Sequence, residues 1–415
     1  MSGWVALAIL IGAVGALAGA PGLLLVAAVT LAYGTLTRLW TRYGMQRVLY
    51  ARRLSADRAV AGDSLTLDVT IWNRKPLPLP WVAADDLVSE TLPVRERPTM
   101  DRDNQSLNRR ILHNAWSLAW YERVIRHFHL DDLRRGVYEL GPVRLRVRDI
   151  LGRDASEEQL QTSDTLIVAP RSLPLRGAGP EAAPLGERRA RRSLHADPAL
   201  YGGVRPFQPG DSLRRVHWRA TARLGQPVSR RYEPARGRQV VLVLDVQTIE
   251  GPEWEMVWDE PAFEGMCVAA ASLARSLLDD GAAVGLAAAS FSGTTQRFAW
   301  LPPQAAPAQL GRVGRLLARI GPVTSAPFGT LLTWLTRRVS PGATLLVLTA
   351  RDPVPHLPAL RRLARMGYAL ELVACGTDAA RHATVARRAA IPARTVGFTP
   401  DPDDPEHADA IVLAG

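Results

Sequence analysis

Residues 3–36 carry no charged side chain, and most of them are apolar. A single helix of this length, rising ~1.5 Å per residue, would far exceed the ~30 Å hydrocarbon core of a bilayer. Ala-Pro-Gly at 20–22 offers a break between two shorter helices. We therefore expect a transmembrane helical hairpin over residues 1–37, with each arm shorter than the usual ~20 residues.

Basic residues follow this apolar run directly, with no acid among them: Arg38, Arg42, Arg47, Arg52 and Arg53. The positive-inside bias then predicts an anchor in the inner or plasma membrane, with the soluble domains in the cytoplasm. A secretory signal peptide is the alternative, because Ala18-Gly19-Ala20 resembles a cleavage site. The missing basic n-region and the second apolar run favour the hairpin.

The charged residues and the cysteines argue against several classes of enzyme. The chain has a formal net charge of +11, and Lys75 is its single lysine. Phosphate-binding P-loops, kinase sites and Schiff-base sites each need a lysine at a defined place, so ATPase, kinase and pyridoxal-phosphate roles are disfavoured. Cys267 and Cys375 lie far apart in apolar stretches, which predicts buried thiols in a reduced compartment. No cofactor is expected.

Four segments follow the hairpin. Short alternating runs separated by Gly, Pro and Asp turns predict an antiparallel, β-sandwich-like domain over 46–170. A stretch rich in Pro, Gly, Ala and Arg over 171–200 is interpreted as a linker. A segment centred on Pro-Gly-Asp occupies 201–238. Continuous apolar strands alternating with amphipathic helices over 239–415 predict a doubly wound, mostly parallel α/β sheet, with helices near 260–280, 306–319, 329–339 and 356–366.

The Pro-Gly-Asp segment predicts a helix over about 212–224. Asp211 is placed to cap it, because its carboxylate can accept the orphan backbone N–H groups of the first turn. One face of this helix would bury Leu213, Val216, Ala220 and Leu224. The opposite flank would carry an arginine stripe with neighbouring polar and aromatic side chains: Arg214, Arg215, His217, Trp218, Arg219 and Arg223.

Three interpretations of this segment stay open: a structural brace with a protein-docking flank, a hydrolase, and a polyanion-binding patch. The brace interpretation expects the Trp218 ring to be buried against a domain together with the apolar face. A hydrolase or peptidase would use Asp211 and His217, yet no nucleophile elbow is present to expose a serine. Residues 176–238 hold 14 arginines against five acids. Nucleic-acid binding would need aromatic platforms or a groove-reading motif, and neither is found, so no nucleic-acid partner is expected.

The first apolar strand of the α/β segment ends at Asp245, where open α/β sheets bind ligands. Three stretches together resemble the bacterial family of domain of unknown function 58, whose members carry a von Willebrand factor A-like domain. They are FQPGDSLRRVHWRATAR, which includes Phe207, Pro209 and Gly210, and then NRKPLPLPW and RRGVYELGPVRLRVRDILG. The usual N-terminal hairpin matches as well.

The resemblance implies a MoxR-type AAA+ ATPase as partner, with a transglutaminase-like membrane protein as a further one, in envelope-related or protein-complex maturation. It also implies a metal site built on Asp-x-Ser-x-Ser, a loop threonine and a later aspartate. Asp245 matches the first aspartate and Thr330 the threonine. Gln247 and Ile249 replace the serines, Ala350 replaces the last aspartate, and Asp352 is displaced by two. We therefore expect a degenerate site without metal and a non-enzymatic adaptor.

Overall fold

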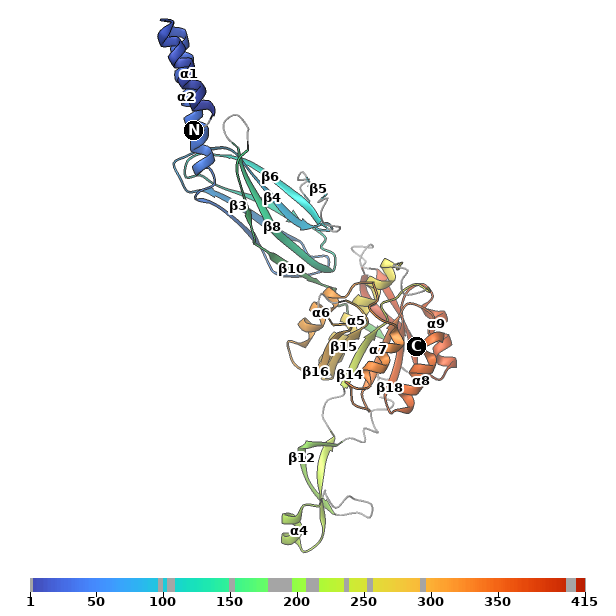
Figure 1. Ribbon diagram of the computed structural model, residues 1–415. Helices are drawn as coiled ribbons and strands as arrows, with labels where there is room; N and C mark the ends of the chain where they lie inside the picture. The colour runs from blue at the N-terminus through green and yellow to red at the C-terminus, as the bar shows by residue number, and fades with distance from the viewer. Residues whose placement is uncertain are drawn as a thin grey trace. The chain divides into compact units, whose positions relative to one another are not determined.

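The structure is a computed structural model. It describes residues 3–95, 100–102, 109–148, 154–177, 196–206, 216–234, 239–251, 257–291, 296–400 and 408–414. The chain divides into two compact units, residues 1–168 and residues 169–415 (Figure 1).

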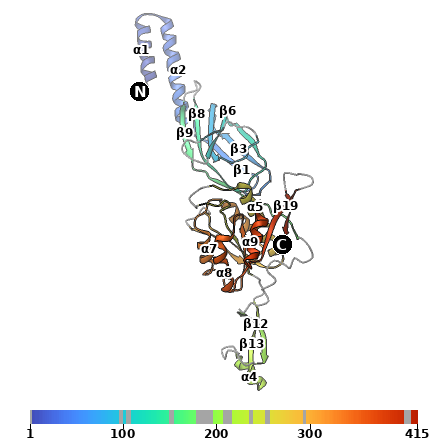
Figure 2. The same ribbon diagram turned by 90° about the vertical axis from the view of Figure 1, so that its right-hand side faces the viewer.

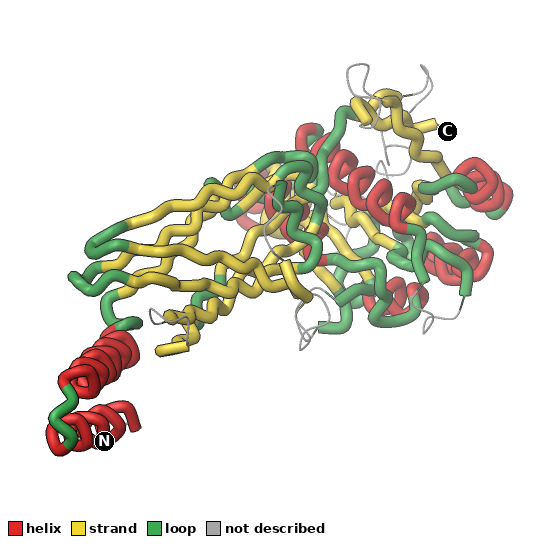
Figure 3. Tube along the Cα trace, turned by 90° about the horizontal axis from the view of Figure 1, so that it is seen from above, coloured by secondary structure: helices red, strands yellow, loops and turns green. Residues whose placement is uncertain are grey.

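Unit 1 begins with two apolar helices, α1 (Gly3–Leu17) and α2 (Pro21–Tyr43). They lie side by side and are joined by a short loop (Figure 3). The rings of Trp4 and Tyr33 meet edge to face at 5.0 Å, and a Cβ added at Gly34 would stand 3.0 Å from that of Trp4. The hairpin forms as expected, but α2 extends six residues past the predicted end. Its stretch 21–40 is long and apolar enough to span a membrane.

The rest of unit 1 consists of two antiparallel sheets. The first has the order β1 (Val48–Leu54), β3 (Leu65–Asn73), β7 (Arg123–Leu130). The second has the order β2 (Arg58–Val60), β10 (Asp164–Ala169), β8 (Gly136–Arg148), β4 (Leu79–Ser89), β6 (Arg109–Leu118), β5 (Met100–Arg102), with β9 (Asp154–Leu160) also paired to β8. Alternating side chains of both sheets fill one buried core, as the period-2 pattern predicts.

Two features tie this core to its surroundings. Trp40, near the end of α2, is buried in it and donates a hydrogen bond from Nε1 to the Pro78 carbonyl at 3.0 Å. Arg52 on β1 and Asp86 on β4 form a buried ion pair at 2.5 Å, which links the first sheet to the second. The Tyr50 hydroxyl donates to the same carboxylate at 2.9 Å.

Unit 2 contains one mixed sheet (Figure 1). Its order is β11 (Leu175–Gly177), β20 (Ala408–Ala414), β19 (Ala393–Pro400), β18 (Ala369–Ala374), β17 (Thr344–Thr349), β14 (Gln239–Leu244), β15 (Ala283–Ala288), β16 (Ala299–Gln304). The five strands from β19 to β15 run parallel, as the alternation of apolar strands and helices predicts. β11 pairs with β20, so part of the predicted linker is a strand of this sheet.

Helices cover both faces of this sheet. Val240, Leu242 and Leu244 pack into one buried cluster with α5 (Glu260–Asp279) and α6 (Gln309–Arg319). Val241 and Val243 point the other way, into a second cluster with three helices, α7 (Phe328–Leu335), α8 (Leu357–Arg365) and α9 (Ala379–Arg388). Burial on both faces explains why the strand is continuously apolar. The two cysteines are free and buried, as expected.

The Pro-Gly-Asp segment differs from its prediction. β12 (Ala196–Pro206) and β13 (Val228–Pro234) form an antiparallel pair, and α4 is limited to Trp218–Leu224 (Figure 2). Val216 makes an isolated antiparallel bridge to Ser229, so it is not part of the helix that the sequence predicts. Residues 212–215 of that predicted helix lie outside the described residues.

Candidate functional site

The candidate site lies at the carboxyl ends of β14 and β17. β15 follows β14 on one side of the sheet and β17 lies on the other, so the strand order reverses at β14. Open α/β sheets bind ligands at such a switch point. Asp245 follows β14 directly, and Thr349 is the last residue of β17. Asp245 therefore lies at this edge of the sheet, as the sequence predicts.

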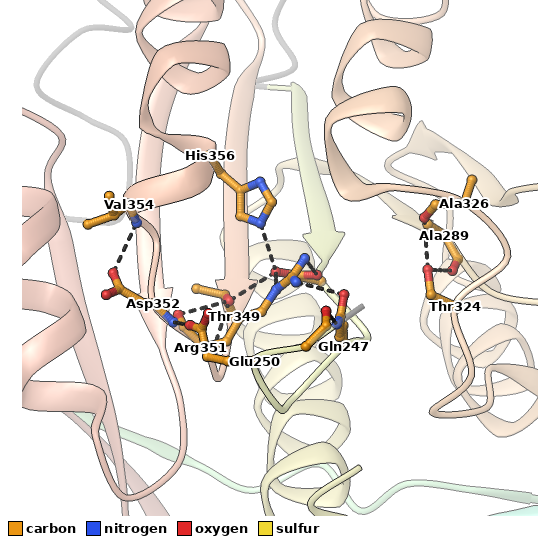
Figure 4. A network of polar contacts seen from close by, with 12 residues as sticks. Gln247, Glu250, Ala289, Thr324, Ala326, Thr349, Arg351, Asp352, Val354 and His356 are labelled. Carbon is orange, nitrogen blue, oxygen red and sulfur yellow. Dashed lines mark hydrogen bonds and ion pairs between the residues drawn. The ribbon is translucent and has the colours of Figure 1, made fainter. Parts of the chain in front are cut away.

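Arg351 holds both oxygens of the Asp245 carboxylate. Its Nε donates to Oδ2 at 2.8 Å and its Nη2 to Oδ1 at 3.0 Å. Its Nη1 donates to Oε1 of Gln247 at 2.6 Å, and the Thr349 hydroxyl donates to Asp245 Oδ2 at 3.2 Å. Figure 4 shows Gln247, Thr349 and Arg351 converging in this way. The side chain of Asp245 is 3% exposed and that of Arg351 13%.

His356 completes the group from the other side. Its Nε2 lies 3.8 Å from Asp245 Oδ2 and has no hydrogen-bond partner among the described residues. Its ring packs edge to face against Phe328 at 5.1 Å. Burial lowers the pKa of His356, so the ring is neutral at pH 7 and Arg351 supplies the positive charge.

The other residues matched to the metal pattern do not join Asp245. Thr330 is exposed in the first turn of α7, with its backbone N–H bonded to Pro327. Asp352 accepts a hydrogen bond from the Val354 N–H at 3.0 Å, while its own N–H donates to Glu250. Ala350 offers no ligand. In the part of the chain that the structure describes, no three His, Cys, Asp or Glu residues are grouped as a metal site would require.

These contacts decide what the site can do. A carboxylate held by a bidentate guanidinium is a poor general base and a poor cation ligand, since a bound cation would have to displace the arginine. Apolar side chains are exposed on loops and helix ends at the carboxyl ends of the same strands: Ile249, Val257, Trp258, Phe291 and Val354. The arrangement is a closed polar centre with an apolar rim.

We expect neither Mg²⁺ nor Mn²⁺ to stabilise the protein, because Arg351 already neutralises Asp245 and a hard cation needs several convergent oxygens. Isothermal titration of the full chain should give no binding heat in the micromolar range. The control is Asp245→Asn, which should behave identically. Micromolar Mg²⁺ affinity that disappears in Asp245→Asn would overturn this expectation.

The second candidate site is α4. Its N-cap is His217, whose Nδ1 accepts a hydrogen bond from the Ala220 N–H at 3.1 Å, so this nitrogen is not free to act as a base. The predicted cap, Asp211, stands six residues before His217 and lies outside the described residues. Trp218 is 68% exposed, whereas a buried ring was expected. The remaining predicted residues, Phe207, Pro209, Gly210, Asp211, Arg214 and Arg215, lie outside the described residues.

Arg219 and Arg223 stand one turn apart on α4, and both are exposed. Over the described ranges neither forms an ion pair. The i, i+4 stripe predicted from the sequence is therefore present for these two positions. Two exposed cations beside an exposed indole form a surface suited to carboxylates.

Sequence reasoning missed Arg351 and His356. The available signal was the Arg-Asp-Pro that follows β17, because an arginine directly after a central strand points toward the same edge as Asp245. In the sequence, Arg351 is one of the many arginines behind the positive net charge and does not stand out.

Part of this chain is similar to a known protein family. Residues 203–347 match the family model described as "Protein of unknown function DUF58". The matched segment includes α4, β14 and the first four residues of β17.

A curated relative is the "Uncharacterized protein YeaD" of Bacillus subtilis (strain 168). It is 25% identical over 253 residues, which cover 59% of this chain and 56% of that protein. The match thus spans about half the length of the relative. Among solved structures, the CARDB domain of the PF1109 protein of Pyrococcus furiosus, in complex with di-metal ions, aligns with a TM-score of 0.21 at 12% identity. That alignment covers 30% of this chain and 94% of that domain.

Proposed function

We propose that this protein is a membrane-anchored, non-enzymatic adaptor that works with a MoxR-type AAA+ ATPase in envelope-related or protein-complex maturation. In this proposal the hairpin of α1 and α2 anchors the chain, with the soluble domains in the cytoplasm. Unit 1 supplies a β-sandwich-like spacer, and unit 2 supplies a von Willebrand A-like module whose metal site has been replaced by an ion pair. The family resemblance supplies the identity of the ATPase.

The observation that carries the proposal is the surface of α4. Arg219 and Arg223 are exposed and have no acid partner among the described residues, and Trp218 stands beside them. A guanidinium gains most from bidentate contact with a carboxylate, and exposed tryptophan and arginine are the side chains that dominate protein interfaces. The complementary partner is an acidic face on the ATPase.

The closed centre at Asp245 supports the same proposal. The Asp245 carboxylate is held on both oxygens by Arg351, and several of the exposed side chains on the loops around it are apolar. Such a rim suits protein contact more than it suits a small polar substrate. A hydrolase would need a nucleophile within reach of a free base, and the Nδ1 of His217 is occupied as a cap.

The test is a double charge reversal, Arg219→Glu with Arg223→Glu, in the full chain. Capture of the purified MoxR-type ATPase should weaken by roughly a hundredfold or more, because hydrogen bonds to charged groups contribute about 1.5–3 kcal/mol each. The melting temperature should barely move, since exposed substitutions stay within about 0.5 kcal/mol.

Arg362→Glu with Arg365→Glu is the matched control. Both arginines are exposed on α8, and the pair changes the net charge equally. Undiminished capture by the α4 variant would reject the docking role, and equal loss in both variants would show a general charge effect. Retention of both wild type and control on heparin, lost only in the α4 variant, would instead favour polyanion binding.

A further inference from the structure

The strand ends of unit 1 place two turns at the end where α2 arrives. The candidate membrane span ends at Trp40, and the Trp40 indole donates to Pro78 in the turn between β3 and β4. The next turn, between β6 and β7, is bonded to that one. Tyr121 N–H donates to the Lys75 carbonyl at 3.2 Å, and Asn73 Nδ2 donates to the Ala119 carbonyl at 2.8 Å. These turns therefore lie level with the end of the span.

The β6–β7 turn exposes two adjacent aromatic side chains. Trp120 is 67% exposed and Tyr121 is 62% exposed. Tyr121 adopts a φ of 57°, in the left-handed region that glycine and asparagine accept far more readily than a bulky residue. Turn formation alone does not call for these aromatic residues. Their exposure indicates a contact outside the chain.

Exposed arginines gather at the same end: Arg42 in the last turn of α2, Arg47, Arg74 and Arg123. None of the four forms an ion pair in the described part of the chain. The one acid in the turn, Glu122, uses its carboxylate to accept the Ala119 N–H. The surface formed by Trp120, Tyr121 and these four arginines is called the membrane-end surface.

We infer that the membrane-end surface rests on the anionic phospholipid headgroups of the bilayer that α2 spans. Tryptophan and tyrosine concentrate at the membrane–water interface, where one end of the ring meets lipid and the other meets water. Juxtamembrane arginines are attracted to anionic lipid. The surface fixes unit 1 against the bilayer at a second point beyond α2. This inference rests on the membrane anchoring in the proposed function.

Site-directed nitroxide labelling tests the inference on the full chain in phosphatidylcholine nanodiscs that contain phosphatidylglycerol. Ala119→Cys places a label beside Trp120 and keeps both aromatic residues. Val29→Cys places a label at the exposed middle of α2. Val60→Cys places an exposed label on β2, next to the loops at the end of unit 1 away from α2. The native thiols are buried, and burial raises the pKa of Cys375 to about 12, so labelling is confined to the introduced cysteine.

The expected result is a gradient of access to a water-soluble nickel complex. The label at position 29 should be almost fully protected from the nickel complex. The label at position 119 should be several-fold less accessible than the label at position 60. Adding Trp120→Ser and Tyr121→Gly to Ala119→Cys should raise its accessibility to that of Val60 without lowering the melting temperature, since glycine relieves the left-handed strain. Phosphatidylcholine alone should expose Ala119 and leave Val29 unchanged.

Three outcomes would overturn the inference in distinguishable ways. A protected Val29 with an Ala119 as accessible as Val60 would reject headgroup contact and leave the anchor standing. An accessible Val29 would reject the anchor, and the inference with it. Protection of Ala119 that does not depend on phosphatidylglycerol would reject the anionic lipid as the ligand.

Discussion

Replacing Arg52 by methionine should destabilise unit 1 by about 3–5 kcal/mol, because it leaves the buried Asp86 carboxylate without its countercharge. The side chains of Arg52 and Asp86 are 2% and 0% exposed. Arg52 also donates through Nη2 to the Leu140 carbonyl at 3.1 Å and to Asp164 at 2.9 Å. Its loss therefore leaves several acceptors in unit 1 without a donor.

Hydrogen exchange of peptides from β1 and β4 measures this loss locally, which suits a chain with two units. Protection should fall by about 10²- to 10³-fold, at roughly 1.4 kcal/mol per factor of ten. The matched control is Arg58→Met, whose ion pair with Asp57 is largely exposed, and it should change stability by less than about 1 kcal/mol. Equal effects of the two substitutions would show that Arg52 stabilises unit 1 no more than a surface arginine does.

The pH dependence gives a second readout of the same pair. Burial outweighs the Arg52 guanidinium and raises the pKa of Asp86 to about 6, above the 3.8 of a free aspartate. The folded state therefore keeps a proton that the unfolded chain has lost, and this contribution is full below pH 4 and vanishes as pH rises through 6. Removing the Arg52 charge raises the pKa of Asp86 further, so the folded state favours the protonated Asp86 carboxyl more strongly. The deficit of Arg52→Met should shrink as pH falls from 7 to 5, and a deficit independent of pH would contradict this account.

Arg351→Leu should be the second large effect, at about 3–5 kcal/mol, because Asp245 would be left buried with the Thr349 hydroxyl as its remaining side-chain donor. Peptides covering the loops after β14 and β17 should lose protection together, since Arg351 connects Asp245 and Gln247 across these loops. Helix α6 should keep its protection.

Two variants sharpen this experiment. Adding Asp245→Asn to Arg351→Leu should recover much of the loss, because the unpaired charge is gone. Arg381→Leu is the matched control. Arg381 forms an ion pair with Asp378, after the end of β18, with an N–O distance of 3.6 Å, and both side chains are 63% exposed. A double variant as unstable as Arg351→Leu alone would mean that hydrogen bonding by Arg351, and not charge neutralisation, supports the edge.

Several features were predictable because their causes are local. The apolar hairpin, its break before Pro21 and the alternating strands of unit 1 follow from composition and period. The α5, α6, α7 and α8 helices were placed near their true positions by amphipathic spacing. The strands β16, β19 and β20 and the helix α9 were not placed from sequence. Of these strands, β16 lies at the edge of the sheet, and its partial exposure makes its apolar pattern weak.

The helix predicted over 212–224 failed for a physical reason. Leu213, Val216 and Ala220 fit helical spacing, but Val216 pairs with Ser229, 13 residues away along the chain. Hydrogen bonding to a distant strand overrides a local period, and the helix starts only after His217 provides a cap. Trp218, expected to be buried, is 68% exposed, while Val216 is buried.

The sequence by itself determined which segments are apolar, which alternate and where turns fall, because these depend on residues within a few positions of one another. It also determined that Asp245 would end a central strand. Only the tertiary structure decided what surrounds that carboxylate. Arg351 stands 106 residues from Asp245 in the chain and reaches it because β14 and β17 are parallel neighbours. The same holds for Arg52 with Asp86 and for Trp40 with Pro78, since which groups meet is set by sheet order and packing.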